Sequence, residues 1–386
     1  MPASLDDLGT ILDGVPAGSW AAIARDDAKL LGWAASADDV LKLAGGKGED
    51  DPIVVRVPVG TPSLLRDPHE TKGADDTPYE GIAEALAAGD AIPFLGAGAS
   101  LTRPSRDDAW DTGKPFLPNG TELAEYLARI AKFPAKLPQD LDLAKVSSYY
   151  EAKLGRKSLR KAIRKALCPR GTDGGPAAIA RGTMHQYLAR REGPKLIVTT
   201  NYDTLIEEAF KAANREYDLL IYPTDDPGQR NTALWRECGR HPEYVPANSL
   251  GITFERPVIY KMHGSLSEEL DDDTFVISED DYVEFLSRMV DKTAVAAAVV
   301  RHLQTRSLLF LGYSLRDWNL RLVLRILSEA SGAGKSARVN ERDEVIPSWA
   351  IQLKPSKVEQ YLWNERKVEI YNQDVEDFAC HLDKLP

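Results

Sequence analysis

The sequence predicts an α/β protein built on a mainly parallel β-sheet with helices on both faces. From Tyr79 onward, apolar segments of strand length alternate with amphipathic segments of helix length, a pattern typical of parallel sheets with helical crossovers. The first of these strands, residues 91–95, runs directly into the glycine-rich turn 96–100. Because glycine has no Cβ, such a turn can bring bare backbone close to a phosphate group.

The first 60 residues are expected to form a small separate domain with the order ββαβ. Strands are predicted over residues 19–24, 29–34 and 52–58, and residues 39–43 are predicted to form a helix that polar residues cap. A unit of this size buries little apolar surface, so we expect it to contact a neighbouring domain, another copy or a partner. Residues 61–78 are rich in proline, glycine and charge and are interpreted as a linker.

Residues 79–386 are expected to form the larger domain. Helices are predicted over residues 80–88, 120–132, 147–167, 183–190, 202–212, 278–288 and 318–328. Strands are predicted over residues 91–95, 195–200, 257–262, 307–311, 348–353 and 368–371.

Composition narrows the classes of function. The 386 residues contain no apolar run of membrane-spanning length and no basic, apolar leader, so we expect a cytoplasmic protein without a membrane partner. A formal charge of −11 disfavours nucleic-acid binding through overall charge, although local basic patches stay open. The three cysteines lie far apart without a C-x-x-C pair, which excludes a four-thiolate zinc site and disfavours a disulfide framework.

Four predicted strands end in residues that can carry chemistry. These ends are Gly96-Ala97-Gly98, Asn201-Tyr202-Asp203, His263-Gly264 and Gly312-Tyr313-Ser314. In a doubly wound sheet, ligands bind outside the carboxyl ends of the strands, so all four segments are expected to face one crevice.

The motifs GAGAS, TTNYD, KMHGSL and LGYSLRDWN, in this order, resemble the sirtuin-like family over roughly residues 79–375. The resemblance implies a Rossmann-like fold that binds NAD⁺ as its substrate. The pattern is most similar to the bacterial antiphage branch of this family, whose members hydrolyse NAD⁺. The short chain with an N-terminal extension also resembles the sirtuin-like subunit that pairs with a HerA-type ATPase, and a homo-oligomer is expected.

The resemblance assigns catalysis to Asn201 and His263. It also assigns cofactor binding to Gly312 and Ser314. Cofactor binding is expected as well at the other strand ends, namely Gly96, Ala97, Gly98, Ser100 and Asp203. Arg316, Asp317 and Asn319 are either supporting residues of the site or an ordinary cap for the next helix.

The residue chemistry is compatible with these roles and leaves alternatives. Asn201 can orient ribose hydroxyls or a water, or can only cap the following helix. His263, with a near-neutral pKa, is expected to act as a general base, or is a hydrogen-bonded structural histidine. Asp203 can bind the cofactor or stabilise the helix N-terminus. Ser100 is expected to donate to a phosphate together with the amides of Gly98 and Ala99.

Two departures from protein-deacylating sirtuins favour water as the acceptor. The chain has no zinc-binding cysteine set, and no Pro-Asp-Phe-Arg segment follows its glycine turn. Residues 102–118 instead form a polar, proline-containing stretch that is suited to act as a lid. A dehydrogenase is disfavoured because the complete G-x-G-x-x-G motif is missing.

The expected function is therefore an NAD⁺ glycohydrolase that releases nicotinamide and ADP-ribose, gated by a partner in phage defence. The alternatives are a non-catalytic NAD⁺ or ADP-ribose sensor that assembles an ATPase, and, last, a protein deacylase. The basic segment 156–165 is either a solvated helix face or a surface for an acidic partner or nucleic acid.

Overall fold

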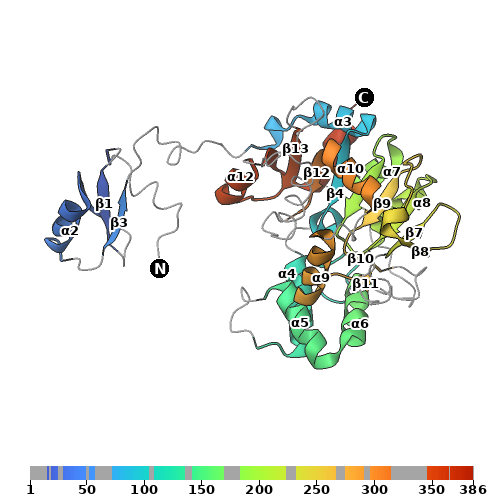
Figure 1. Cartoon of the computed structure of the whole chain (residues 1–386), viewed down its shortest axis with the longest axis horizontal. Helices are drawn as coiled ribbons and strands as arrows, with labels where there is room; N and C mark the ends of the chain where they lie inside the picture. Colours follow the sequence, from blue (N-terminus) through green and yellow to red (C-terminus); the bar gives the residue numbers. More distant parts are fainter. Residues whose placement is uncertain are drawn as a thin grey trace. The chain divides into compact units, whose positions relative to one another are not determined.

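A computed structural model provides the structure of the chain, and its contacts divide the chain into two compact units, Met1–Glu70 and Thr71–Pro386 (Figure 1). Each unit is described by itself. The residues that the structure describes are 15–16, 19–24, 29–48, 52–56, 72–103, 108–134, 141–168, 183–222, 232–266, 274–290, 296–313, 346–364 and 366–385.

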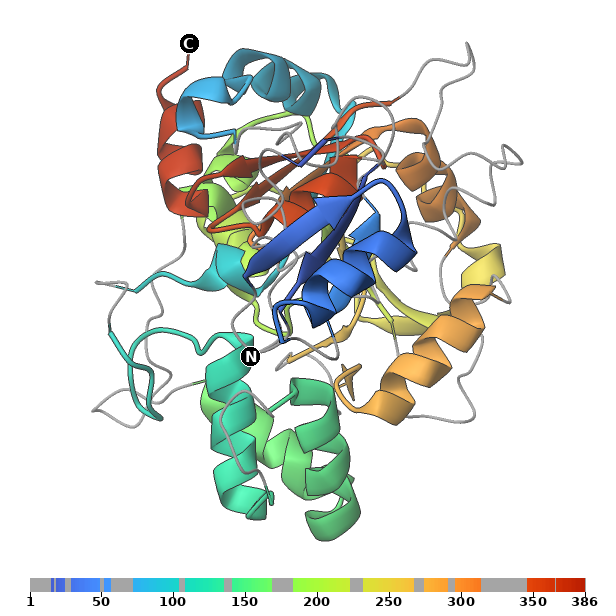
Figure 2. The same ribbon diagram turned by 90° about the vertical axis from the view of Figure 1, so that its left-hand side faces the viewer.

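The N-terminal unit has the predicted order ββαβ. Its strands β1 (Trp20–Ile23), β2 (Leu30–Ala34) and β3 (Ile53–Arg56) form an antiparallel sheet with β1 in the centre, and α2 (Ala37–Gly45) follows β2. Ser36 caps α2 by accepting a hydrogen bond from the amide of Asp39 at 3.2 Å. Figure 2 shows α2 beside the sheet. Val40 and Ala44 of this helix form an apolar cluster with Ala22 of β1. The apolar core of this unit is therefore small among the described residues.

The larger unit is an α/β protein with a Rossmann-like sheet, as the sequence predicts. Within the described residues the sheet has nine strands in the order β14-β13-β12-β4-β5-β9-β6-β7-β8. All neighbours from β14 to β6 are parallel, and β7 and β8 add an antiparallel edge. The strands are β4 (Ala91–Leu95), β5 (Leu196–Thr199), β6 (Asp218–Ile221), β7 (Thr232–Arg236), β8 (Glu243–Pro246), β9 (Val258–Lys261), β12 (Ser307–Leu311), β13 (Ser348–Gln352) and β14 (Val368–Asn372).

Two layers of helices cover the sheet. One apolar cluster joins it to α9 (Glu279–Val290), α10 (Ala297–Thr305) and α12 (Lys357–Asn364). A second cluster on the other face joins it to α3 (Tyr79–Ala88), α7 (Thr183–Arg190), α8 (Leu205–Ala212) and α13 (Val375–Asp383). The central strands β4, β5, β9 and β12 are buried at every position, as expected for parallel strands covered on both faces.

Three helices form a separate layer with its own apolar cluster, and Figure 1 shows them grouped beside α9. They are α4 (Gly120–Ala131), α5 (Leu143–Leu154) and α6 (Arg156–Leu167). The single helix predicted over residues 147–167 is wrong, because Gly155 adopts a φ of 83° and separates α5 from α6. Arg156, at the start of α6, pairs with Glu151 at 3.0 Å and Asp281 at 2.8 Å.

The structure also contains elements that the sequence pattern did not predict. These are β6, β7, β8, the helices α10, α12 and α13, and a short hairpin of β10 (Gly264–Ser265) and β11 (Thr274–Phe275). The helix predicted over residues 202–212 starts only at Leu205, because the Asp203 carboxylate accepts a hydrogen bond from the Leu205 amide at 3.0 Å. The helix predicted over residues 318–328 lies outside the described residues. Among the helices that are described, none is long and apolar enough to cross a membrane.

Candidate functional site

The topological switch point of the sheet lies between the neighbouring strands β4 and β12, and the glycine turn lies at this point. β4 is the first strand of the sheet along the chain, β5 lies on one side of it and β12 on the other. Residues 97–100 after β4 form a short 3₁₀ helix, η2. In open parallel sheets such a reversal opens a crevice at the carboxyl ends of the strands, which is where ligands bind.

Glycine is required at positions 98 and 312 because the turns after β4 and β12 are in contact, which leaves no space for a Cβ. A Cβ on Gly98 would lie 2.7 Å from the Cα of Gly312, and one on Gly312 would lie 2.2 Å from the amide nitrogen of Ala99. Gly312 also adopts a φ of 68°, which glycine tolerates best. These two glycines therefore allow the backbones of the two turns to approach each other closely.

This contact corrects the predicted phosphate cradle. The amide of Gly98 donates to the Gly312 carbonyl at 2.9 Å, and the amide of Ala99 donates to the Gly96 carbonyl at 3.0 Å. Neither amide is free to bind a phosphate, because backbone acceptors of the two turns already occupy both. Ala97 is exposed, and among the described residues no acceptor is recorded for its amide, so this N–H is the one that the turn offers to a ligand.

The structure joins Asn201 to the glycine turn. Its side-chain nitrogen donates to the Gly96 carbonyl at 2.9 Å and to Ser100 Oγ at 3.0 Å. Its backbone amide donates to Thr199 Oγ1 at 3.0 Å, so both the side chain and the backbone of Asn201 are held. Within the described part of the chain no partner is recorded for its Oδ1, and Asn201 is half-buried. Ser100 is buried and acts as an acceptor for Asn201.

Asp203 makes the helix contact that the sequence left as an alternative. It is buried, and its carboxylate binds the Leu205 amide near the start of α8. Its backbone carbonyl accepts a hydrogen bond from Lys261 Nζ. The role of Asp203 toward a cofactor stays a proposal.

His263 follows β9 and is buried against aromatic rings. Its ring makes edge contacts with Tyr282 and Phe285, with centroid distances of 5.5 and 5.3 Å. Burial lowers the pKa of His263 to about 3, because the apolar surroundings disfavour the imidazolium. The expected near-neutral pKa is therefore wrong, and His263 is neutral at pH 7. Gly264, which follows His263, is needed for the pairing of β10 with β11, since a Cβ at this position would lie 2.1 Å from the Thr274 carbonyl oxygen.

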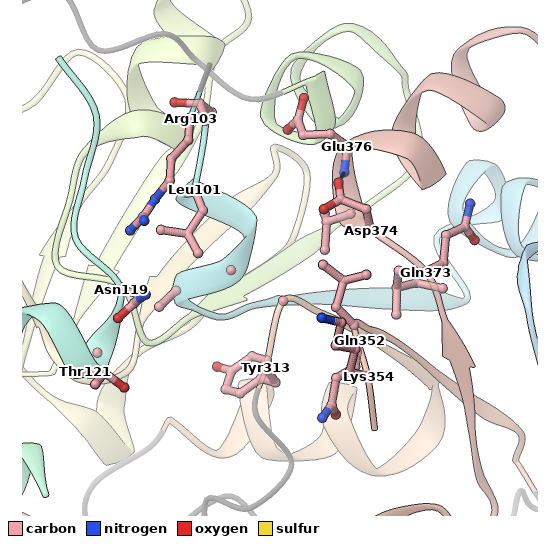
Figure 3. A pocket seen from close by; sticks show the side chains of 18 of the residues that line it. Leu101, Arg103, Asn119, Thr121, Tyr313, Gln352, Lys354, Gln373, Asp374 and Glu376 are labelled. Carbon is pink, nitrogen blue, oxygen red and sulfur yellow. Dashed lines mark hydrogen bonds between the residues drawn. The ribbon is translucent and has the colours of Figure 1, made fainter. Parts of the chain in front are cut away.

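A pocket of about 1160 Å³ opens beside the glycine turn (Figure 3). Ala97, Gly98 and Gly312 line it at the switch point, and Tyr313 adds an aromatic ring. Its wall includes polar residues from the ends of β13 and β14 and from the N-termini of α4 and α13, namely Asn119, Thr121, Gln352, Lys354, Gln373, Asp374, Glu376 and Asp377. The pocket is therefore built where an α/β sheet binds nucleotides.

The segment after the glycine turn is fastened at the edge of this pocket. Arg103, which lines the pocket, forms a bidentate ion pair with Glu122 of α4. The Glu122 carboxylate also accepts hydrogen bonds from the amides of Trp110 at 3.1 Å and Asn119 at 2.8 Å. Burial disfavours the charged carboxylate, but these hydrogen bonds outweigh it and hold the pKa of Glu122 below its usual range. Arg103 and Trp110 of the predicted lid, residues 102–118, thus bind the same carboxylate as Asn119, which directly follows it.

The predicted site residues form two groups. Ala97, Gly98 and Gly312 line the pocket, whereas Gly96, Ser100 and Asn201 are joined by hydrogen bonds and do not line it. Neither Asp203 nor His263 lines this pocket, and Ser314, like Arg316, Asp317 and Asn319, lies outside the described residues. Among those described, no group of three His, Cys, Asp or Glu residues is arranged to hold a metal ion.

Sequence reasoning gave no role to two contributors to the site, Tyr313 and Lys261, although both stand in the strand-end motifs. Tyr313 bonds to Thr200 at 2.9 Å between the hydroxyl groups and packs against Gly96. Lys261 is the only charged residue in the apolar stretch 257–262, and the structure buries it completely. A charge inside a predicted strand is a signal that could have identified Lys261.

Comparison with known proteins associates part of the chain with one family. Residues 195–371, somewhat less than half of the chain, match the family model described as SIR2-like domain. This range includes Asn201, His263 and Gly312 and begins after the glycine turn.

Curated proteins give no match. Among solved structures, one of a Sir2 mutant with a p53 peptide and NAD matches at 13% identity with a TM-score of 0.31, covering 79% of this chain and 97% of that one.

Proposed function

We propose that this chain is an NAD⁺ glycohydrolase that cleaves the bond between nicotinamide and ribose. The observation that carries the proposal is the pair of hydrogen bonds from Asn201 to the glycine turn, whose residues Ala97 and Gly98 line a pocket of about 1160 Å³ at the switch point. The SIR2-like match over residues 195–371 supports NAD⁺ as the nucleotide.

In this proposal the pocket holds the adenosine diphosphate part of NAD⁺. The free amide of Ala97 is suited to bind a phosphate oxygen, and Asp374, at the end of β14, is suited to accept hydrogen bonds from ribose hydroxyls. Tyr313 offers an aromatic face. The nicotinamide riboside part then extends past the turn toward Asn201 and His263.

The chemistry requires little proton transfer early in the reaction. The C–N bond to the ribose breaks, and nicotinamide leaves as a neutral molecule with the bonding electrons, so its departure needs no general acid. The ribose carbon becomes oxocarbenium-like, water adds to it, and the water proton is released. The amide oxygen of Asn201 is suited to orient the water or a ribose hydroxyl. A histidine with a pKa of about 3 is a weak base, but it is neutral at pH 7 and can accept a hydrogen bond from the incoming water.

We further propose a role in antiphage defence, in which a partner gates the activity. An always-active NADase would deplete the NAD⁺ of its own cell, so gating by a HerA-type ATPase within a cytoplasmic homo-oligomeric assembly is expected. The resemblance of the strand-end motifs to the antiphage branch supports this context.

The test is to incubate the purified chain with NAD⁺, alone and together with a HerA-type ATPase, and to measure nicotinamide release. We expect equal amounts of nicotinamide and ADP-ribose, and at least a 100-fold loss in Asn201→Ala, about the effect of removing a group that orients the reactants. Full activity of Asn201→Ala, or NAD⁺ that stays intact under both conditions, would contradict the proposal.

One observation favours a second candidate, a subunit that binds NAD⁺ or ADP-ribose without turnover and assembles an ATPase. The low pKa of His263 makes this residue a weak base at the proposed reaction centre. Titration calorimetry distinguishes the two candidates: a sensor binds the nucleotide with a finite Kd and releases no nicotinamide, in the presence of the ATPase as well.

A further inference from the structure

Lys261 is a fully buried lysine at the end of β9, where the proposed reaction centre begins. Its side chain is 0% exposed. The ammonium group pairs with Glu207 Oε1 of α8 at 2.9 Å and donates a second hydrogen bond to the backbone carbonyl of Asp203. Lys261 therefore connects three elements: β9, α8 and the segment after β5.

The positions of these contacts in the chain are informative. Lys261 lies two residues before His263, and Asp203 lies two residues after Asn201. One side chain thus connects the segment that carries Asn201 to the segment that carries His263. A backbone hydrogen bond from the Leu266 amide to the Tyr202 carbonyl, at 2.8 Å, joins the same two segments.

Stability alone does not explain a lysine at this position. A buried ion pair must overcome the loss of hydration of both charges, and apolar residues of similar volume often stabilise a protein equally well or better. This pair is also incomplete among the described residues, because the second Glu207 oxygen, Oε2, is buried without a hydrogen-bond partner. An ammonium group, however, can bind a carboxylate and a carbonyl at the same time, which an apolar side chain cannot do.

We propose that Lys261 is a positioning residue that fixes Asn201 relative to His263 by holding the carbonyl of Asp203. This inference rests on the proposed NAD⁺ hydrolysis. Glu207 holds the ammonium group in place and neutralises its charge. Neither residue lines the pocket beside the glycine turn, so their loss is expected to affect turnover more than NAD⁺ binding.

The test separates positioning from stability with a double variant. Lys261→Met leaves the Glu207 carboxylate buried without its partner, so this variant is expected to be clearly less stable than the wild type. Lys261→Met combined with Glu207→Leu removes both charges and is expected to restore the unfolding midpoint. The Asp203 carbonyl still lacks its donor, so kcat stays reduced by about 10- to 100-fold while KM for NAD⁺ changes less than about threefold.

An ion pair at the opposite end of β9 offers a matched control. Arg256 pairs with Asp218 at 3.2 Å, where β6 and β9 begin. Arg256→Met combined with Asp218→Asn removes an ion pair from these strands without touching either proposed catalytic segment. Its kcat is expected to equal that of the wild type within about twofold, a change of less than 0.5 kcal/mol in the activation barrier.

A readout that needs no turnover keeps the inference separate from the proposed function. Hydrogen–deuterium exchange of the amides in residues 199–206 is expected to be faster in the double charge-removal variant than in the wild type and in the control. If the wild type has no NADase activity but this exchange difference is observed, the proposed function fails and the positioning contact stands. A double variant with wild-type exchange and wild-type kcat would overturn the inference.

Discussion

Replacing Gly98 by alanine tests the close contact of the two turns that shape the pocket. The new Cβ would lie 2.7 Å from both the Cα and the carbonyl oxygen of Gly312, and both are backbone atoms that cannot rotate away. Overpacking of this kind costs about 1–3 kcal/mol. If the turns separate, the hydrogen bond from the Gly98 amide to the Gly312 carbonyl weakens, which costs about 0.5–1.5 kcal/mol more. We expect a total loss of about 1.5–4.5 kcal/mol in the free energy of unfolding.

Urea denaturation of the full chain, followed by tryptophan fluorescence, measures this loss. Gly81→Ala is the matched control, because Gly81 lies within α3 and a Cβ there meets no atom within 4 Å. Alanine at this helical position should stabilise the protein by about 0.5–1 kcal/mol. Because the separated turns also change the pocket wall, the Gly98→Ala variant should bind NAD⁺ more weakly than the wild type. A Gly98→Ala variant with the unfolding midpoint and the NAD⁺ affinity of the wild type would refute the reasoning.

Two further predictions concern His263 and Glu122. The pKa of His263 is about 3 in the folded chain and near 6.5 when unfolded, so the unfolded state binds the proton first and stability falls as the pH drops below 6.5. Between pH 7 and pH 5 the wild type should therefore lose about 2 kcal/mol more than His263→Phe in denaturant titrations, and equal losses would exclude a buried neutral histidine. Glu122→Ala removes the shared acceptor of Arg103, Trp110 and Asn119 and should cost about 2–3 kcal/mol. Limited proteolysis should then cleave near residues 103–118 faster than in the wild type, and an unchanged pattern would show that this carboxylate does not fasten the segment.

The parallel core of the sheet could be predicted from the sequence because its strands are short, apolar and bounded by clear turn residues. β4, β5, β9 and β12 were found in this way, as were two of the residues that line the pocket, Gly98 and Gly312. The strands β7 and β8 were missed because they are partly exposed at the antiparallel edge, where apolar continuity is weak. The strand β6 was also missed, although it is buried at every position. The helices α5 and α6 were merged because amphipathic spacing continues across Gly155, and only the positive φ of this glycine separates them.

The sequence could predict which residues lie at the strand ends of the candidate site, but not their hydrogen-bond partners or pKa values. The pattern placed Asn201 and His263 at strand ends, but it could not show that Asn201 binds the turn itself or that aromatic rings surround His263. A pKa depends on burial by residues distant in sequence, here Tyr282 and Phe285 of α9, which a local motif does not contain. The amide of Gly98 was misassigned for a related reason, since its acceptor, the carbonyl of Gly312, lies in the turn after a different strand.

The measurement that most directly tests NAD⁺ hydrolysis at this site is the release of nicotinamide by the wild type and by Asn201→Ala, each incubated with the HerA-type ATPase in water enriched in ¹⁸O. We predict that the wild type forms one ADP-ribose for each nicotinamide, that the ADP-ribose carries one ¹⁸O atom from water, and that Asn201→Ala forms neither product above background. Intact NAD⁺ in the wild-type reaction, or equal product from Asn201→Ala, would contradict hydrolysis at the strand ends that hold Asn201 and His263.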